Sequence, residues 1–330
     1  MRAPILITAF LVYVFAMPVG VQAGQAKAVP EVGFLLPVQP ADKDNRPEGI
    51  RHLKAIMDGL QALGYIEGKN IHVELRRPRK PEDLAEMAAD LVNRKVDIIA
   101  TMGPQPIEAA RRATATIPIV IVACDRADRL VNSIARPGGN ITGMACISSD
   151  LALKRLQLMQ QMLPGLAHLA VLFNGGVPAK VAELQDITAA AKTLEVEVHP
   201  ADVRDASEFT TAFAALKAGN PDGLFILADP LTVIHVKEIA KFAAENHMPS
   251  MFGFREFCDA GGLLSYGANL TNQFRRYGYF VDKILKGTKP GDIPIEEPTS
   301  FELIVNARTA KLLGLSIPNS ILVSADEVIE

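Results

Sequence analysis

Ten residues that suit the binding of a small molecule stand at or just beyond the ends of short apolar runs in this sequence. Runs of this length are typical of strands that are buried in a parallel sheet. Ligands of such sheets bind outside the carboxyl ends of the strands, so we take these positions as candidate ligand-binding residues. They are Gln39, Thr101, Met102, Gly103, Cys124, Asp125, Asn174, Asp229, Phe254 and Glu256.

These candidates offer charge, hydrogen bonds and an aromatic face, and each also has a structural alternative. Asp125 or Asp229 can pair with a ligand ammonium group, or can cap the helix that follows it. Asn174 can hydrogen-bond a ligand or simply turn the chain. Phe254 can stack on a flat ligand or pack in the core. The sequence leaves both uses open.

The stretch Thr101-Met102-Gly103 leads into a predicted helix that begins at Gln105. The amides and the dipole at the start of a helix favour a negative charge, so a ligand carboxylate is a suitable partner here. The alternative is an ordinary connection between a strand and a helix.

The sequence contains none of the common catalytic or nucleotide-binding motifs, since GxSxG, HExxH, Walker A and GxGxxG are all missing. Its six histidines show no metal-ligand spacing. We therefore expect no enzyme activity, no cofactor and no metal. A secreted two-domain isomerase-type enzyme, with Cys124 as nucleophile and Asp125 as general base, is kept as an alternative.

Apolar runs alternate with helical patterns along most of the chain, which is the arrangement of α/β proteins with parallel sheets. The pattern occurs twice in tandem, so we expect an α/β fold of two Rossmann-like lobes. The expected strands are 32–36, 71–75, 96–100, 117–123 and 141–146 in the first lobe, and 168–173, 196–199, 223–227 and 250–252 in the second. A helix is expected over 125–135, after the fourth strand.

The end of the chain breaks this alternation. Its expected elements are a strand at 263–266, a helix at 270–286, a proline-rich loop at 287–300, a strand at 301–305, a short helix at 309–313 and a tail from 321. If both lobes are complete before these elements, the chain must return to one lobe and then to the other. We therefore expect three crossovers, with lobe one at 24–147 and 265–300, and lobe two at 148–264 and 301–330.

The first 23 residues are predicted to be a secretory signal peptide. Arg2 is followed by an apolar run over residues 5–17, and Val21 and Ala23 are small residues suited to a cleavage site. Position 24 is a glycine, so no lipid-anchor cysteine would follow cleavage. We expect a protein that is exported to the periplasm.

Charge and cysteine usage narrow the class of protein further. The net charge of −3 gives no basic footprint for nucleic acid. The three cysteines, Cys124, Cys146 and Cys258, fit neither a CxxC motif nor a zinc site. We expect three buried free thiols, and a disulfide between Cys124 and Cys146 stays open because export permits it.

Several segments together resemble the ABC-transporter substrate-binding proteins of the tryptophan/tyrosine type, which have the type I periplasmic-binding fold. They are VGFL at 32–35, LGYIEGKN at 63–70, RPGGNITG at 136–143, ADP at 228–230, REF at 255–257, AGGL at 260–263, SYG at 265–267 and ADEVI at 325–329. They occur in the family's order along nearly all of the chain after residue 23.

The resemblance implies a monomeric protein whose two lobes close on a small molecule and then dock on an ABC permease in the inner membrane. It also implies an amino acid-like or carboxylate ligand, aromatic ligands included. A ligand-loaded partner of a membrane sensor is kept as an alternative, because the sequence does not distinguish the two roles.

Overall fold

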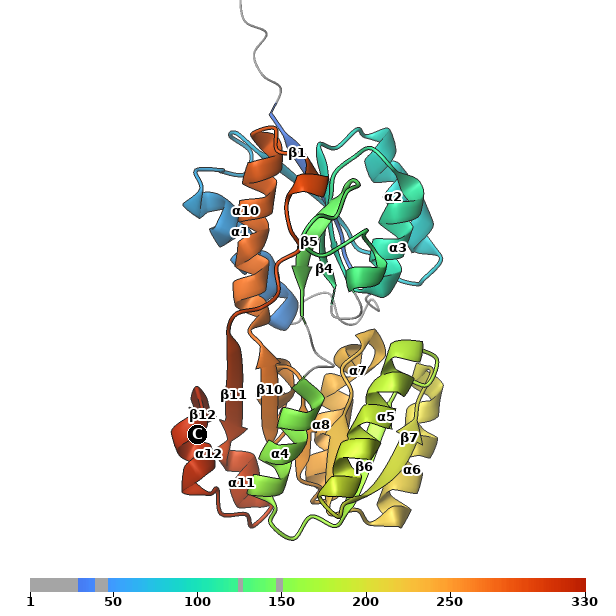
Figure 1. Ribbon diagram of the computed structural model, residues 1–330, viewed down its shortest axis with the longest axis vertical. Coiled ribbons are helices and arrows are strands. Elements are labelled where there is room, and N and C mark those ends of the chain that lie inside the picture. Colours follow the sequence, from blue (N-terminus) through green and yellow to red (C-terminus); the bar gives the residue numbers. More distant parts are fainter. Residues whose placement is uncertain (1–28, 39–46, 124–126, 147–150) are drawn as a thin grey trace, which may run out of the picture.

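The computed structural model describes residues 29–38, 47–123, 127–146 and 151–330, which form two α/β lobes (Figure 1). The predicted signal peptide at 1–23 and the first interlobe joint at 147–150 lie outside the described residues. Within these ranges, no helix combines the length and the apolar character needed to cross a membrane.

Lobe one is built on a parallel five-stranded sheet with the order β2-β1-β3-β4-β5. Its strands are β1 (Glu31–Leu35), β2 (His72–Arg76), β3 (Ile98–Met102), β4 (Ile119–Ala123) and β5 (Ile141–Ala145). Its helices are α1 (Pro47–Ala62), α2 (Asp83–Asn93), α3 (Pro104–Ala113) and α10 (Leu270–Leu285).

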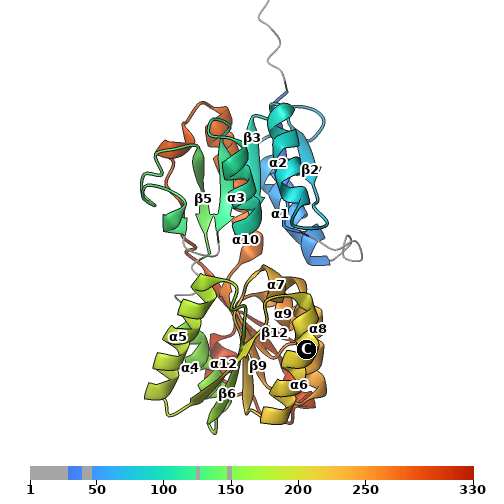
Figure 2. The ribbon, with the colours of Figure 1, turned by 90° about the vertical axis from the view of Figure 1, so that its right-hand side faces the viewer.

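Both faces of this sheet are covered, which explains why its strands are continuously apolar. Alternate side chains of a strand point to opposite faces. Phe34 accordingly packs with residues of α1 and α10, whereas Leu35 packs with residues of α2 and α3. Figure 1 shows α1 and α10 on one side of the sheet and α2 and α3 on the other, and Figure 2 looks onto the layer of α2 and α3.

Lobe two is built on a seven-stranded sheet with the order β12-β11-β10-β9-β8-β6-β7. Its strands are β6 (His168–Phe173), β7 (Glu197–Asp202), β8 (Gly223–Ile226), β9 (Ser250–Phe252), β10 (Leu264–Ala268), β11 (Phe301–Asn306) and β12 (Glu327–Ile329). Its helices are α4 (Ala152–Met162), α5 (Pro178–Thr193), α6 (Phe209–Gly219), α7 (Pro230–Ile234), α8 (Val236–Glu245), α9 (Arg255–Asp259), α11 (Ala307–Leu312) and α12 (Asn319–Ser324). All neighbouring strands are parallel except β10 and β11, which are antiparallel.

The expected two lobes and three crossovers are confirmed. After β10 the chain returns to lobe one, where α10 packs against α1. Glu296 then forms a parallel bridge with Met144 of β5, and the chain crosses back into β11 of lobe two. We expected lobe one to resume at residue 265, but β10 pairs with β9 and β11, so the chain leaves lobe two only after Ala268.

Two expected elements differ from the structure: the helix after the fourth strand and the tail at the end of the chain. The helix expected over 125–135 is a 3-10 turn at Ala127–Arg129 in its described part. Beyond this turn the Asn132 amide donates to the carbonyl oxygen of Pro137 over 3.1 Å and not to the residue four positions before it, so the helix does not continue. The expected tail from residue 321 instead contains most of α12 and the whole of β12, which pairs with β11.

The three cysteines do not share one state. Cys258 is a buried free thiol, and burial raises its pKa to about 12. Cys146 is disulfide-bonded, so the expectation of free thiols is wrong for this residue. Its partner lies outside the described residues.

Candidate functional site

The strand ends of the two lobes meet in one interlobe region. Helix α1 follows the carboxyl end of β1, and α9 follows that of β9. Nη1 of Arg51 on α1 lies 3.0 Å from Oδ2 of Asp259 on α9, and Nε2 of His52 lies 3.1 Å from Oε1 of Glu256. These two contacts join the lobes at the edge where ligands of parallel sheets bind.

Asn174 and Asp229 are brought together at the carboxyl ends of the neighbouring strands β6 and β8. Both side chains are buried, and Nδ2 of Asn174 donates to Oδ2 of Asp229 over 2.6 Å. Oδ1 of Asp229 accepts from the Thr232 amide at 2.8 Å, which makes Asp229 the N-cap of α7. Burial raises the pKa of Asp229 above its ordinary value. In this structure each residue has the structural role that the sequence offered as an alternative: Asn174 turns the chain and Asp229 caps α7.

A buried charged group lies close to Asp229 and was missed from the sequence. Nζ of Lys180 lies 3.0 Å from Oε2 of Glu183, and its charge acts to lower the pKa of Asp229 against the larger effect of burial. Lys180, Glu183, Ile187 and Ala191 form the buried stripe of α5 at helical spacing. A lysine and a glutamate within a stripe that is otherwise apolar are the signal that could have revealed the group.

Arg155 completes this buried group from α4. Its side chain has no exposed surface, and Nε donates to the carbonyl oxygen of Tyr266 over 2.6 Å. Burial lowers the pKa of Arg155 to about 10, with the charge of Glu183 opposing that shift. The guanidinium therefore joins α4 to β10, the strand that leads into the second crossover.

The stretch from Thr101 to Gly103 serves the framework of lobe one. Oγ1 of Thr101 donates to the carbonyl oxygen of Leu35 over 2.8 Å. The Tyr277 hydroxyl on α10 donates to the carbonyl oxygen of Thr101 over 2.6 Å. Met102 is the half-buried last residue of β3, and Gly103 has φ +80°, a conformation that favours glycine.

The start of α3 is a weaker carboxylate site than we expected. Its first three residues are Pro104, Gln105 and Pro106. Proline has no amide hydrogen, so only Gln105 among them can donate a backbone hydrogen bond to an anion.

Phe254 and Glu256 both belong to the interlobe end of lobe two. Phe254 is buried and meets Phe252 edge-on, with ring centroids 6.1 Å apart. Glu256 is buried too and is paired with His52 of lobe one. Packing is therefore realised for Phe254, and the partner of Glu256 in this structure is an imidazole of the other lobe. Gln39, Cys124 and Asp125 lie outside the described residues.

Two surface hollows lie away from these candidates. The larger, of about 490 Å³, is lined by residues of α10 and the third crossover, among them Gln273, Arg276 and Glu296. The smaller, of about 320 Å³, is lined by Arg111, by residues 129–132, by Pro137 and by residues 139–141. Neither contains a candidate ligand-binding residue.

One group of side chains in the described ranges has the donors and spacing for a metal ion. It consists of His168, Glu197 and His199, at the amino ends of β6 and β7. The carboxyl ends of these two strands face the interlobe region, where Asn174 follows β6. The group lies at the opposite ends of the strands and is therefore separate from the candidate ligand site.

Known proteins match the chain over most of its length. Residues 46–329 match the model of a family described as ABC transporter substrate binding protein. A curated relative, the tyrosine-binding protein of Clostridioides difficile (strain R20291), is 27% identical over 281 residues, which covers 83% of this chain and 80% of the relative.

Two solved structures share the fold. A conserved domain protein from Vibrio cholerae has a TM-score of 0.82 at 22% identity, covering 91% of this chain and 99% of the other. An ABC domain from Streptococcus pneumonia, solved in complex with L-Trp, has a TM-score of 0.82 at 21% identity with the same coverage of 91% and 99%. The architecture is that of the type I periplasmic-binding proteins. Since the family match extends over residues 46–329, the chain belongs to the family of ABC transporter substrate-binding proteins.

Proposed function

We propose that this protein is the solute-binding component of an ABC importer and that its solute is an amino acid, with aromatic amino acids as the first candidates. Its family and its relatives are binding proteins that take small molecules. The observation that carries the choice of solute is the buried pair of Asn174 and Asp229 at the interlobe end of lobe two.

Asp229 suits the ammonium group of an amino acid. Each of its carboxylate oxygens already accepts one hydrogen bond, from Asn174 and from Thr232. A carboxylate has about four acceptor positions, so capacity for a ligand donor is left. A hydrogen bond between two charged groups is worth about 1.5–3 kcal/mol, more than one between neutral groups.

An aromatic side chain is supported by the relatives and by Phe254. One relative is named for tyrosine, and one structure of the same fold holds L-Trp. Phe254 lies at the same end of lobe two as Asp229, and its ring offers a face or an edge to a flat ligand.

Calorimetric titration with L-tyrosine, L-tryptophan, L-phenylalanine, L-alanine and benzoate tests the proposal. We expect saturable binding of at least one aromatic amino acid, and weaker binding of alanine and benzoate. Asp229→Asn keeps a capping side chain but removes the charge, and should weaken binding by about 10- to 150-fold. The matched control is Asp205→Asn, an exposed capping aspartate of another helix, which should leave the affinity unchanged.

Two results would count against the proposal. A folded protein that binds none of these amino acids would refute the choice of solute. Unchanged affinity in Asp229→Asn would refute the role of Asp229 and leave the solute to be placed elsewhere.

The family match supports a role with an importer outside the cytoplasm. Proteins of this family work outside the cytoplasm. We infer that residues 1–23 direct export, that cleavage follows Ala23, and that the loaded protein meets a permease as a monomer. The mass of the protein recovered from the periplasm, and co-purification with the permease in the presence of the amino acid, test these steps.

Ligand binding should draw the two lobes together. Because β10 pairs with β9 and β11, we infer lobe boundaries near 269 and 300 and propose that hinge rotation occurs at these crossovers. We expect the radius of gyration measured by X-ray scattering to fall when a bound amino acid is added, and an unchanged radius would contradict the hinge.

A further inference from the structure

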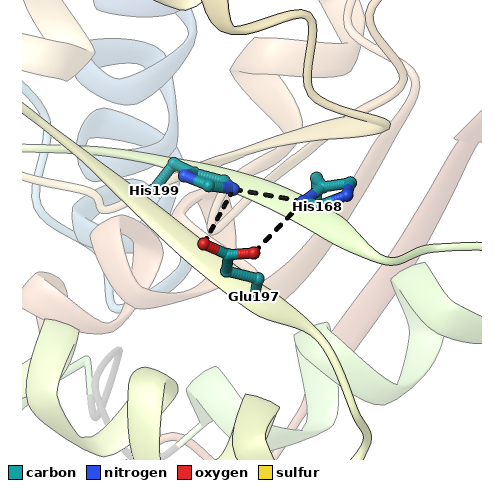
Figure 3. A group of neighbouring side chains, drawn as sticks. All are labelled: His168, Glu197 and His199. Carbon is teal, nitrogen blue, oxygen red and sulfur yellow. Dashed lines mark hydrogen bonds and ion pairs between the residues drawn. The ribbon is translucent and has the colours of Figure 1, made fainter.

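We propose that His168, Glu197 and His199 form a binding site for a divalent transition metal ion of the zinc class on the outer surface of lobe two. The three side chains are drawn in Figure 3. The inference concerns the amino ends of β6 and β7 and does not depend on which solute the interlobe region binds.

The parallel pairing of β6 and β7 places the three side chains on one face of the sheet. His168 lies directly opposite Glu197, and Ala170 lies opposite His199. Directly paired residues share a face, as do residues two apart along a strand. Ala170 on β6 and Ala201 on β7 lie on the same face of the sheet and belong to the hydrophobic core. The group therefore lies at the solvent-exposed edge of a sheet face that is buried further along the strands.

The distances between the donor atoms suit a small tetrahedral ion. Nδ1 of His168 lies 3.3 Å from Nε2 of His199. Zinc–nitrogen bonds of about 2.0–2.1 Å at tetrahedral angles place two ligand nitrogens roughly 3.3–3.4 Å apart. Oε2 of Glu197 lies 3.6 Å from Nδ1 of His168, and Oε1 of Glu197 lies 3.9 Å from Nε2 of His199. A small rotation of the carboxylate brings one of these oxygens within ligand distance of an ion held by the two nitrogens.

The donor set indicates which ions fit. Two imidazoles with one carboxylate suit Zn²⁺, Cu²⁺ or Ni²⁺, whereas Mg²⁺ and Ca²⁺ prefer oxygen ligands alone. All three side chains are exposed, so water is available for a fourth position. Three protein ligands and one water are a common arrangement for zinc.

The backbone of this site is held in place before any ion binds. Oδ2 of Asp222 accepts from the backbone amides of Ala167 and His168, at 2.9 and 2.7 Å. The amide of Asp222 in turn donates to the carbonyl oxygen of His168 over 2.9 Å. The carboxylate thus fixes the start of β6, and the ladder between β6 and β7 fixes Glu197 and His199 relative to it.

The consequence of metal binding follows from the position of β7. This strand is at the edge of the seven-stranded sheet, with β6 as its neighbour. An ion held by His168 on β6 and by Glu197 and His199 on β7 joins the edge strand to the sheet. Because the ion binds the folded state, it should stabilise lobe two in proportion to its free concentration.

The experiment uses the full exported chain, freed of any polyhistidine tag, with ZnCl₂ as the probe. We expect calorimetry to show one Zn²⁺ bound per chain and the melting temperature to rise with Zn²⁺ but not with Mg²⁺. His199→Ala and Glu197→Gln should each weaken the affinity for Zn²⁺ by at least about tenfold, the loss that even an outer-shell change can cause. Amino acid binding should be unchanged in both variants.

The control is His247→Asn, which removes another exposed histidine; asparagine tolerates the φ of 51° at that position. It should bind Zn²⁺ as the wild type does. Absence of saturable Zn²⁺ binding in the wild type would overturn the proposal. So would wild-type affinity in the double variant His168→Ala/His199→Ala, whose folding is checked by its circular dichroism spectrum.

Discussion

Nδ2 of Asn174 lies 2.6 Å from Oδ2 of Asp229, although 55 positions separate the two residues in the sequence. The contact exists because β6 and β8 are neighbours in the sheet and both end at the interlobe region. It holds a buried carboxylate in a fixed orientation, with its second oxygen occupied by the cap of α7. A carboxylate fixed in this way is ready to receive a cation without reorganisation.

The charge of Asp229 should make stability depend on pH. Burial raises its pKa in the folded protein above the ordinary 3.8, so the folded state binds the proton more tightly than the unfolded state. The stability from this group is therefore greatest below pH 3.8 and is lost as the pH rises through the raised pKa. Urea unfolding of the ligand-free protein at several pH values from 4 to 7 should show the wild type losing stability relative to Asp229→Asn. A difference that stays constant across this range would show that the carboxyl is not shifted.

The ion pair between Arg51 and Asp259 should favour the lobe arrangement seen here. Both side chains are about one-third exposed, at 37% and 29%, so their coupling is worth roughly 0.2–1 kcal/mol. Arg51→Ala should raise the radius of gyration of the ligand-free protein, because the lobes are held together less often. Lys54→Ala is the control, since it breaks a pair with Asp58 inside α1. Equal radii in Arg51→Ala and Lys54→Ala would exclude a role in holding the lobes.

The crossing of α1 and α10 depends on two glycines. A Cβ added at Gly278 would lie 2.5 Å from the carbonyl carbon of Gly59, which is closer than packed atoms allow. Gly278→Ala should therefore lower the free energy of unfolding by about 1–3 kcal/mol, the usual cost of overpacking. Gly219→Ala, at the end of α6, meets no atom within 4 Å and should be neutral or slightly stabilising. The two alanine variants are compared by chemical denaturation, and equal stabilities would contradict the close crossing.

Thiol titration separates the states of the cysteines. The buried Cys258 thiol, with its pKa raised to about 12, should not react with a disulfide reagent at pH 8 in the native protein. Unfolding without a reductant should release one reactive thiol, because Cys146 is disulfide-bonded, and reduction should release all three. Three thiols without reduction would contradict the disulfide.

The sequence by itself determined the architecture and the family. Apolar runs that alternate with helical patterns are a local property, and they were sufficient for two α/β lobes with parallel sheets. The segments from 63 to 329 that resemble one family led to the same class of protein as the family match. The cap at Asp229 was one of the two roles that the sequence offered for this residue, because an aspartate before a proline at a first helical position is itself a local signal.

The tertiary structure decided what each candidate contacts. Glu256 pairs with His52 across the lobes. The hydroxyl of Tyr277 on α10 donates to the carbonyl oxygen of Thr101, which lies 176 positions earlier in the chain. The extent of β10 in lobe two and the grouping of His168 with Glu197 and His199 depend on strand pairing and register. Such contacts arise from the relative placement of distant segments, which residue spacing along one chain does not encode.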